Sequence, residues 1–203
     1  MVLRYVALGD SYTIGTSVAA ADRWPDRLVR ALREPDGADR LQLVANLAVN
    51  GWTSGDVIRA QLPELERLQP EFASLLIGVN DVVQGVPEAT YRANVEAILD
   101  ALLARLPVNR TVVVTTPDYT VTPAGADYGD PVTQRAGIVR NNAVLIAAAV
   151  ARQIVVVDVF DLSERAAGDR SLVAPDGLHP SGAQYALWVE RIAPVARGLL
   201  EGA

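Results

Sequence analysis

The sequence has no cysteine, no lysine and only one histidine among its 203 residues. The absence of cysteine excludes disulfides and thiolate metal sites. One histidine is too few for a zinc site built from several imidazoles. No loop has the carboxylate spacing that a Mg²⁺ or Ca²⁺ site would need. The sequence therefore predicts a protein without a metal site.

Long hydrophobic runs and an excess of positive charge are also missing. Without a run of about 18 or more apolar residues, no transmembrane segment is expected. The formal net charge of −6 makes nucleic acid and anionic membranes unfavourable partners. No signal-peptide pattern is present, so we expect a cytoplasmic protein, with the mature form of an exported precursor as the alternative. Nothing in the sequence fixes the oligomeric state.

Length and composition indicate one globular domain over residues 1–203. Hydrophobic residues make up 50% of the chain and charged residues 21%, proportions typical of globular proteins. A chain of this length fits one hydrophobic core, and no internal repeat, low-complexity tract or linker divides it.

Short apolar segments alternate with helical patterns along the chain, which indicates an α/β protein with a parallel sheet. A first strand ends at Gly9, and further strands are expected over residues 41–47, 72–77, 111–115 and 154–157. Helices are expected over residues 24–34, 88–106, 134–151 and 182–200, and Pro63 is expected to start a short helix of its own. A five-stranded sheet with helices on both faces, in three layers, accounts for this pattern.

Small or polar residues follow the first three expected strands. Ser11 offers a hydroxyl, Gly51 a backbone N–H without a side chain to block it, and Asn80 an amide group. Because the carboxyl ends of parallel strands face the ligand crevice, these groups should lie together. Acyl transfer needs such a set, namely a nucleophile and donors directed at the developing oxyanion.

The only imidazole that could act as a base is His179, near the other end of the chain. Asp176 precedes it by three residues, so one turn can place the carboxylate beside the imidazole Nδ1–H. The imidazole Nε2 is then free to accept the proton of Ser11. The fold would have to bring residue 179 back to residue 11.

Four motifs in this order resemble those of the GDSL, or SGNH, hydrolase superfamily. They are Gly9-Asp10-Ser11, Gly51, Gly78-Val79-Asn80-Asp81 and Asp176-Gly177-Leu178-His179-Pro180, and they extend over nearly the whole chain. The resemblance implies a flavodoxin-like sheet with strand order 2-1-3-4-5 and hydrolysis of esters or thioesters by a serine nucleophile. Tyr12 stands where the family name has leucine, a position to which we assign no chemistry.

The resemblance implies a catalytic triad and an oxyanion hole. Ser11, Asp176 and His179 would form the triad, and the N–H groups of Ser11 and Gly51 with the Asn80 side chain would bind the oxyanion. The substrate would be a small ester with a short to medium acyl chain, and no cofactor is needed. A thioester or lysophospholipid, or an acetylated carbohydrate, remains an alternative substrate.

Each of these residues also has a purely structural interpretation. Ser11 could cap a helix, Asn80 and Gly51 could form turns, and Asp176 could cap the last helix. The chain could then be a small-molecule or anion-binding module without catalysis. Such a module does not require the aspartate–histidine pair, which favours the hydrolase.

Some residues are expected to support or line the site rather than to react. We interpret Asp10 and Asp81 as structural groups that bind loop backbone. A long loop over residues 117–133, rich in proline and glycine, carries Tyr119 and Tyr128. Long loops in compact domains tend to be functional. These two tyrosines are therefore candidates for the lining of a pocket. Trp52, which lies outside this loop, is a third candidate.

Overall fold

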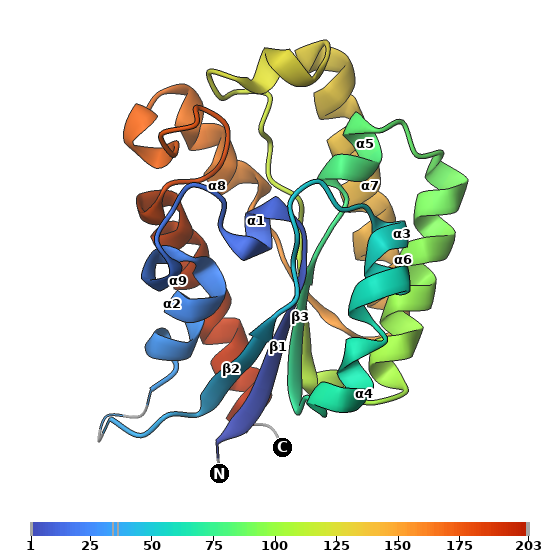
Figure 1. Ribbon diagram of the computed structural model, residues 1–203, viewed down its shortest axis with the longest axis vertical. Helices are drawn as coiled ribbons and strands as arrows, with labels where there is room; N and C mark the ends of the chain where they lie inside the picture. The colour runs from blue at the N-terminus through green and yellow to red at the C-terminus, as the bar shows by residue number, and fades with distance from the viewer. Residues whose placement is uncertain (1, 34, 36, 202–203) are drawn as a thin grey trace.

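A parallel five-stranded sheet lies at the centre of the molecule, in the order β2-β1-β3-β4-β5 (Figure 1). The structure is a computed structural model that describes residues 2–33, 35 and 37–201. The strands are β1 (Leu3–Gly9), β2 (Leu41–Asn46), β3 (Phe72–Leu76), β4 (Thr111–Val114) and β5 (Val155–Val157). The α/β fold and the strand order expected from the sequence are confirmed.

Helices cover both faces of the sheet (Figure 1). One face carries α2 (Trp24–Ala31) and α9 (Gly182–Glu201), which pack against each other. The other carries α3 (Ser54–Asp56), α4 (Glu64–Leu68), α6 (Glu88–Leu103) and α7 (Pro131–Ala151). The remaining α-helices of the described residues are short, namely α1 (Ser11–Ile14), α5 (Val79–Val83) and α8 (Phe160–Glu164).

The inner strand β1, which lies between β2 and β3, contributes to both hydrophobic cores. Successive side chains of a strand point to opposite faces of the sheet. Tyr5 and Ala7 accordingly join the cluster under α2 and α9, whereas Val6 and Leu8 join the cluster under α6 and α7. All four are fully buried, so β1 is held rigidly at the point where it delivers residues 10 and 11.

The predicted loop over residues 117–133 is shorter than expected, because α7 begins at Pro131 and not at residue 134. Asp130 caps this helix by accepting a hydrogen bond from the Thr133 N–H at 2.9 Å. Proline fits the first helical turn, where its missing N–H leaves no bond unmade. The loop also contains a short 3-10 helix, η4 (Gly125–Tyr128), so part of it has regular structure.

Other element boundaries differ from the predictions by a few residues. α2 ends at Ala31 rather than at residue 34, which lies outside the described residues, and α6 ends at Leu103. Pro63 directly precedes α4, as expected, and follows a π-helical segment, η2 (Val57–Gln61). Among the described helices, none is both long and apolar enough to cross a membrane.

The side chain of Gln61 continues the sheet where β2 stops. The last paired residues of β1 and β2 are Ala7 and Asn46, and Leu47 N–H still donates to the Ala7 carbonyl. The backbone N–H and carbonyl of Gly9, two residues after Ala7, point to the same edge of β1, where β2 no longer pairs with it. There, Gln61 accepts from the Gly9 N–H at 2.9 Å and donates to the Gly9 carbonyl at 2.7 Å. This buried amide therefore takes the place of a neighbouring strand at Gly9, two residues before Ser11.

We expect Gln61→Ala to lower the free energy of unfolding by about 2–4 kcal/mol, because a buried N–H and a buried carbonyl both lose their partner. The measurement is urea denaturation of the two proteins. Gln42→Ala, which removes an exposed glutamine from β2, is the matched control and should change stability by less than about 0.5 kcal/mol. Equal stability of the two variants would contradict this role of Gln61.

Candidate active site

Ser11 is the first residue of α1, directly after β1. The cap of this helix is Asp10, whose Oδ1 accepts from the Tyr12 N–H at 3.0 Å, and the helix ends at Gly15 with φ of 72°. Ser11 is only 6% exposed, and its hydroxyl makes no hydrogen bond to any described residue. The capping role considered for Ser11 thus belongs to Asp10, which is a structural group as expected but binds the backbone of α1 and not of a loop.

Asp176 and His179 form an ion pair in which His179 Nδ1 lies 2.7 Å from Asp176 Oδ2. The other carboxylate oxygen, Oδ1, accepts from the N–H groups of Leu178 at 2.9 Å and His179 at 3.0 Å. Ser17 Oγ also donates to Oδ2, at 2.6 Å. Because α9 begins only at Gly182, Asp176 does not cap that helix.

The environment of Asp176 holds it in the charged form. Partial burial opposes ionisation, but the hydrogen bonds from Ser17, from two backbone N–H groups and from His179 outweigh it and lower the Asp176 pKa to about 2. A carboxylate that stays ionised can orient the imidazole and stabilise its protonated form.

Asn80 and Gly51 lie on neighbouring segments joined by hydrogen bonds. Asn80, in α5, donates one amide hydrogen to the Trp52 carbonyl at 2.9 Å, which leaves the second for another acceptor. Gln84, at the end of α5, donates to the Gly51 carbonyl at 2.8 Å. Gly51 has φ of 79°, a conformation that favours glycine, and its N–H donates to no described residue.

A hydrogen-bond network centred on Asp81 and Ser54 connects the segment of Asn80 to the segment that follows Gly51. Asp81 accepts from Ser54 N–H at 2.9 Å and from Ser54 Oγ at 2.5 Å, and Asn94 donates to the same hydroxyl at 3.0 Å. Burial raises the pKa of Asp81, although the bonds from Ser54 oppose this shift. Asp81 is a structural group as expected, but its backbone partner, Ser54, is the first residue of α3 and does not belong to a loop, and no sequence pattern pointed to Ser54 and Asn94.

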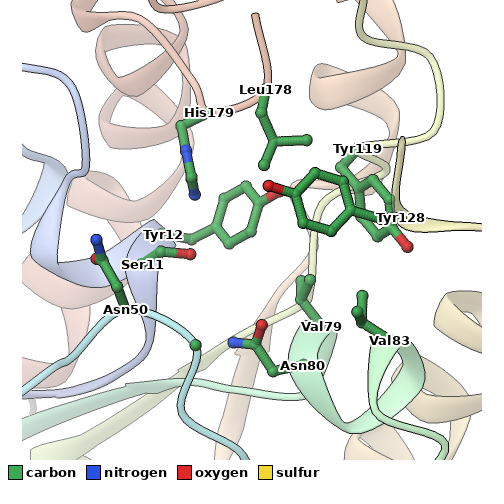
Figure 2. A pocket seen from close by; sticks show the side chains of 11 residues that line it. Ser11, Tyr12, Asn50, Val79, Asn80, Val83, Tyr119, Tyr128, Leu178 and His179 are labelled. Carbon is green, nitrogen blue, oxygen red and sulfur yellow. The ribbon is translucent and has the colours of Figure 1, made fainter. Parts of the chain in front are cut away.

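A pocket of about 230 Å³ brings most of the predicted residues together, although Asp176 and Trp52 do not line it (Figure 2). Its polar side consists of Ser11, Asn50, Gly51, Asn80 and His179. Its other side is mainly apolar and consists of Tyr12, Val79, Val83, Tyr119, Tyr128 and Leu178. Figure 2 shows the imidazole of His179 directed toward Ser11, with Asn80 on the opposite side of the serine.

The described residues include no hydrogen bond between Ser11 and His179, although both line the same pocket. In proteins without bound substrate, such bonds are often long and tighten only in the reactive complex. The Ser11 hydroxyl and the Nε2 atom of His179 therefore have no partner among the described residues, while Nδ1 is paired with Asp176, and both residues line the space where a substrate would lie.

The sequence predicted the positions of four aromatic residues near the pocket only in part. Tyr119 and Tyr128 line the pocket as expected, and their rings make an edge contact with the ring centroids 6.0 Å apart. Trp52 is not among the lining residues: its turn presents the main-chain carbonyl, which binds Asn80. Tyr12, to which no role was assigned, lines the pocket and packs against His179, with the two ring centroids 5.2 Å apart.

Within the described part of the chain, no group of three or more histidine, cysteine, aspartate or glutamate residues could hold a metal ion. The polar side of the pocket instead offers the hydroxyl of Ser11, the imidazole of His179 and several N–H donors. This set suits nucleophilic attack on a carbonyl and binding of the resulting oxyanion.

Comparison with known proteins gives a consistent result. Residues 7–187 match the model of the GDSL-like Lipase/Acylhydrolase family. No curated protein matches the chain in sequence.

Several solved structures share the fold at low sequence identity. TesA superposes with a TM-score of 0.72 at 21% identity, over 97% of this chain and 99% of its own. A variant of Axe2, an acetyl xylan esterase from Geobacillus stearothermophilus, gives 0.74 at 16% identity, over 96% and 94%. The esterase EstA from Pseudoalteromonas sp. gives 0.72 at 19% identity, over 98% of both chains.

The buried carboxyl of Asp10 makes stability depend on pH. Its Oδ2 has no partner among the described residues, and burial, assisted by the negative charge of Asp81, raises its pKa to about 8 despite the bond from Tyr12. Between about pH 4 and pH 8 the unfolded chain loses this proton while the folded protein keeps it. The free energy of unfolding should therefore fall as pH rises through this window, by up to about 1.4 kcal/mol per pH unit.

We expect Asp10→Asn to flatten that dependence, because asparagine keeps the oxygen that caps Tyr12 N–H but cannot titrate. The measurement is denaturant unfolding at a series of pH values. Asp127→Asn, at an exposed position, is the control and should keep the wild-type slope. An Asp10→Asn profile parallel to wild type would mean that Asp10 is already ionised in the folded protein.

Proposed function

Because the chain belongs to the GDSL-like lipase/acylhydrolase family and is a carboxylic ester hydrolase of that type, we propose that it cleaves short- to medium-chain acyl esters through an acyl-enzyme on Ser11. One observation carries the proposal. An unengaged serine hydroxyl, an imidazole paired with an ionised aspartate and free N–H donors all meet in one pocket.

In the first step, Ser11 Oγ attacks the ester carbonyl while His179 Nε2 takes the hydroxyl proton. The carbonyl oxygen becomes an oxyanion, which the N–H groups of Ser11 and Gly51 and the free amide hydrogen of Asn80 bind. Asp176 stabilises the imidazolium that forms. As the oxyanion collapses, the ester bond breaks and His179 returns the proton to the departing alcohol.

In the second step, water repeats the sequence on the acyl-enzyme. His179 accepts a proton from the water, whose oxygen attacks the acyl carbonyl and forms a second oxyanion in the same place. Collapse releases the carboxylic acid, and the proton returns to Ser11 Oγ. The same donors therefore serve both steps, and the reaction as proposed uses no cofactor.

The size and lining of the pocket support a substrate of limited length. About 230 Å³ is below the usual range of roughly 300–1,000 Å³ for pockets that enclose drug-sized ligands. Valine, leucine and tyrosine side chains form the wall away from Asn50, which suits an acyl chain rather than a charged group. Thioesters and acetylated sugars carry the same carbonyl chemistry and belong in the substrate test.

We expect Ser11→Ala to reduce kcat for p-nitrophenyl acetate by about 10³-fold or more, because no other group in the pocket can form the acyl-enzyme. A fluorophosphonate probe should label wild type once, at Ser11, and leave the variant unlabelled. Ser171→Ala, at an exposed serine outside the pocket, is the control and should keep kcat within about twofold. Near-wild-type turnover by folded Ser11→Ala protein would refute the assignment.

Tyr128 is expected to limit acyl length, since it is 44% exposed and forms the outer part of the apolar wall. Tyr128→Ala should raise kcat/KM for longer acyl chains relative to acetate by roughly threefold or more, because it opens that wall. The measurement is a profile of p-nitrophenyl esters from acetate to palmitate. The control is Val132→Ala, which shortens a 77% exposed side chain, four residues from Tyr128, that does not line the pocket. If both variants give the wild-type profile, Tyr128 does not bound the acyl chain.

A further inference from the structure

Ser17 lies in the segment that follows the nucleophile and has an unusual backbone conformation. Its φ is +64°, in the left-handed region that non-glycine residues rarely adopt. Residues held in this region cost stability and persist where the surrounding structure requires them. In this segment, Gly15 and Thr16 both donate their N–H groups to the Ser11 carbonyl, at 3.0 and 3.2 Å. The chain therefore turns sharply here and presents residues 16 and 17 to other loops.

The hydroxyl of Ser17 binds the carboxylate of Asp176, which is 159 residues away in the sequence. It donates to Oδ2 at 2.6 Å, the same oxygen that lies 2.7 Å from His179 Nδ1. Oδ1 is held by two backbone N–H groups of its own turn. Ser17 is thus the one described residue outside that turn that bonds to the carboxylate and so fixes it relative to Ser11.

The neighbouring residue, Thr16, makes a second connection of the same kind. Its Oγ1 donates to Asn50 Oδ1 at 2.6 Å, directly before Gly51. Two adjacent hydroxyls therefore connect the nucleophile's segment to the loop of Gly51 on one side and to the loop of Asp176 on the other. The left-handed residue of this segment, Ser17, is the one that makes the bond to Asp176.

We propose that Ser17 is a positioning residue for catalysis, which orients Asp176 and, through it, the imidazole of His179 toward Ser11. The proposal rests on the hydrolytic function proposed above. Ser17 does not line the pocket, so it acts through Asp176 and should affect kcat rather than substrate binding. A misplaced imidazole slows both proton transfers, since catalysis depends steeply on the geometry of the reacting groups.

Two substitutions separate this role from a purely structural one. Ser17→Ala removes the hydroxyl and keeps the unfavourable backbone conformation, whereas Ser17→Gly removes the hydroxyl and relieves that conformation. We expect both to lower kcat roughly 5- to 50-fold with KM within about twofold of wild type. Ser17→Gly should nevertheless have a Tm no lower than that of Ser17→Ala, so activity and stability would not change together.

The single histidine provides a second readout that does not depend on turnover. In protein labelled with ¹⁵N-histidine, one imidazole gives the whole signal, and the Nδ1–H resonance reports its bond to Asp176. Both Ser17 variants should shift or broaden this resonance. Ser171→Ala is the matched control, because Ser171 Oγ donates to the Asp169 carboxylate at the same distance of 2.6 Å but outside the pocket.

The outcomes distinguish the two proposals. Unchanged kcat or an unchanged imidazole resonance in both Ser17 variants would overturn the positioning role. Effects of equal size in Ser171→Ala would also overturn it, since the changes would then not be specific to Asp176. If wild type hydrolyses none of the esters, the proposed function fails, while the imidazole resonance still tests whether Ser17 orients the pair.

Discussion

All five strands run parallel, so after each strand the chain must cross back to the starting edge before the next one begins. As a result, the loops that follow the strands emerge together at one edge. Ser11 follows β1, Gly51 follows β2 and Asn80 follows β3, and these strands are neighbours in the sheet. The proximity of the three groups is therefore a consequence of the topology and requires no contact between the loops themselves.

Topology brings these loops together, but buried hydrogen bonds determine how closely they are placed. Gln61 completes the end of β1, Asn46 donates to the Thr13 carbonyl at 2.8 Å, and Tyr185 donates to the Tyr12 carbonyl at 3.0 Å. Each contact satisfies a backbone group that would otherwise be unpaired near the pocket. Because an unpaired buried polar group costs about 1–3 kcal/mol, these contacts restrict the nucleophile's segment to one arrangement.

Much of the fold and the main candidate residues could be predicted from the sequence, because they depend on local patterns. Alternating strand and helix segments indicated the parallel sheet, and short motifs identified Ser11, Asn80 and the Asp176–His179 pair. The start of α7 was missed although its signal was present: an aspartate before a proline is a common helix start, but Pro131 was assigned to the loop.

The contacts that could not be predicted join polar groups distant in the sequence. Ser17 and Asp176 are 159 positions apart and Gln61 and Gly9 are 52 apart, and neither pair follows a helical or strand period. Trp52 was a candidate for the pocket lining, but its contribution is a main-chain carbonyl that any residue type could supply.

The carboxyl groups near Ser11 are held in opposite charge states, and both states favour the proposed reaction. Hydrogen bonds keep Asp176 ionised beside His179, where positive charge develops when the imidazole takes a proton. Asp10, directly before Ser11, is fully buried, and burial raises its pKa to about 8, so it is largely neutral at about pH 7. The oxyanion would form close to the start of α1, where a second negative charge in a low-dielectric environment would oppose it. Keeping Asp10 protonated lets its side chain cap α1 without adding that charge, while the ionised carboxylate of Asp176 lies on the far side of the imidazole.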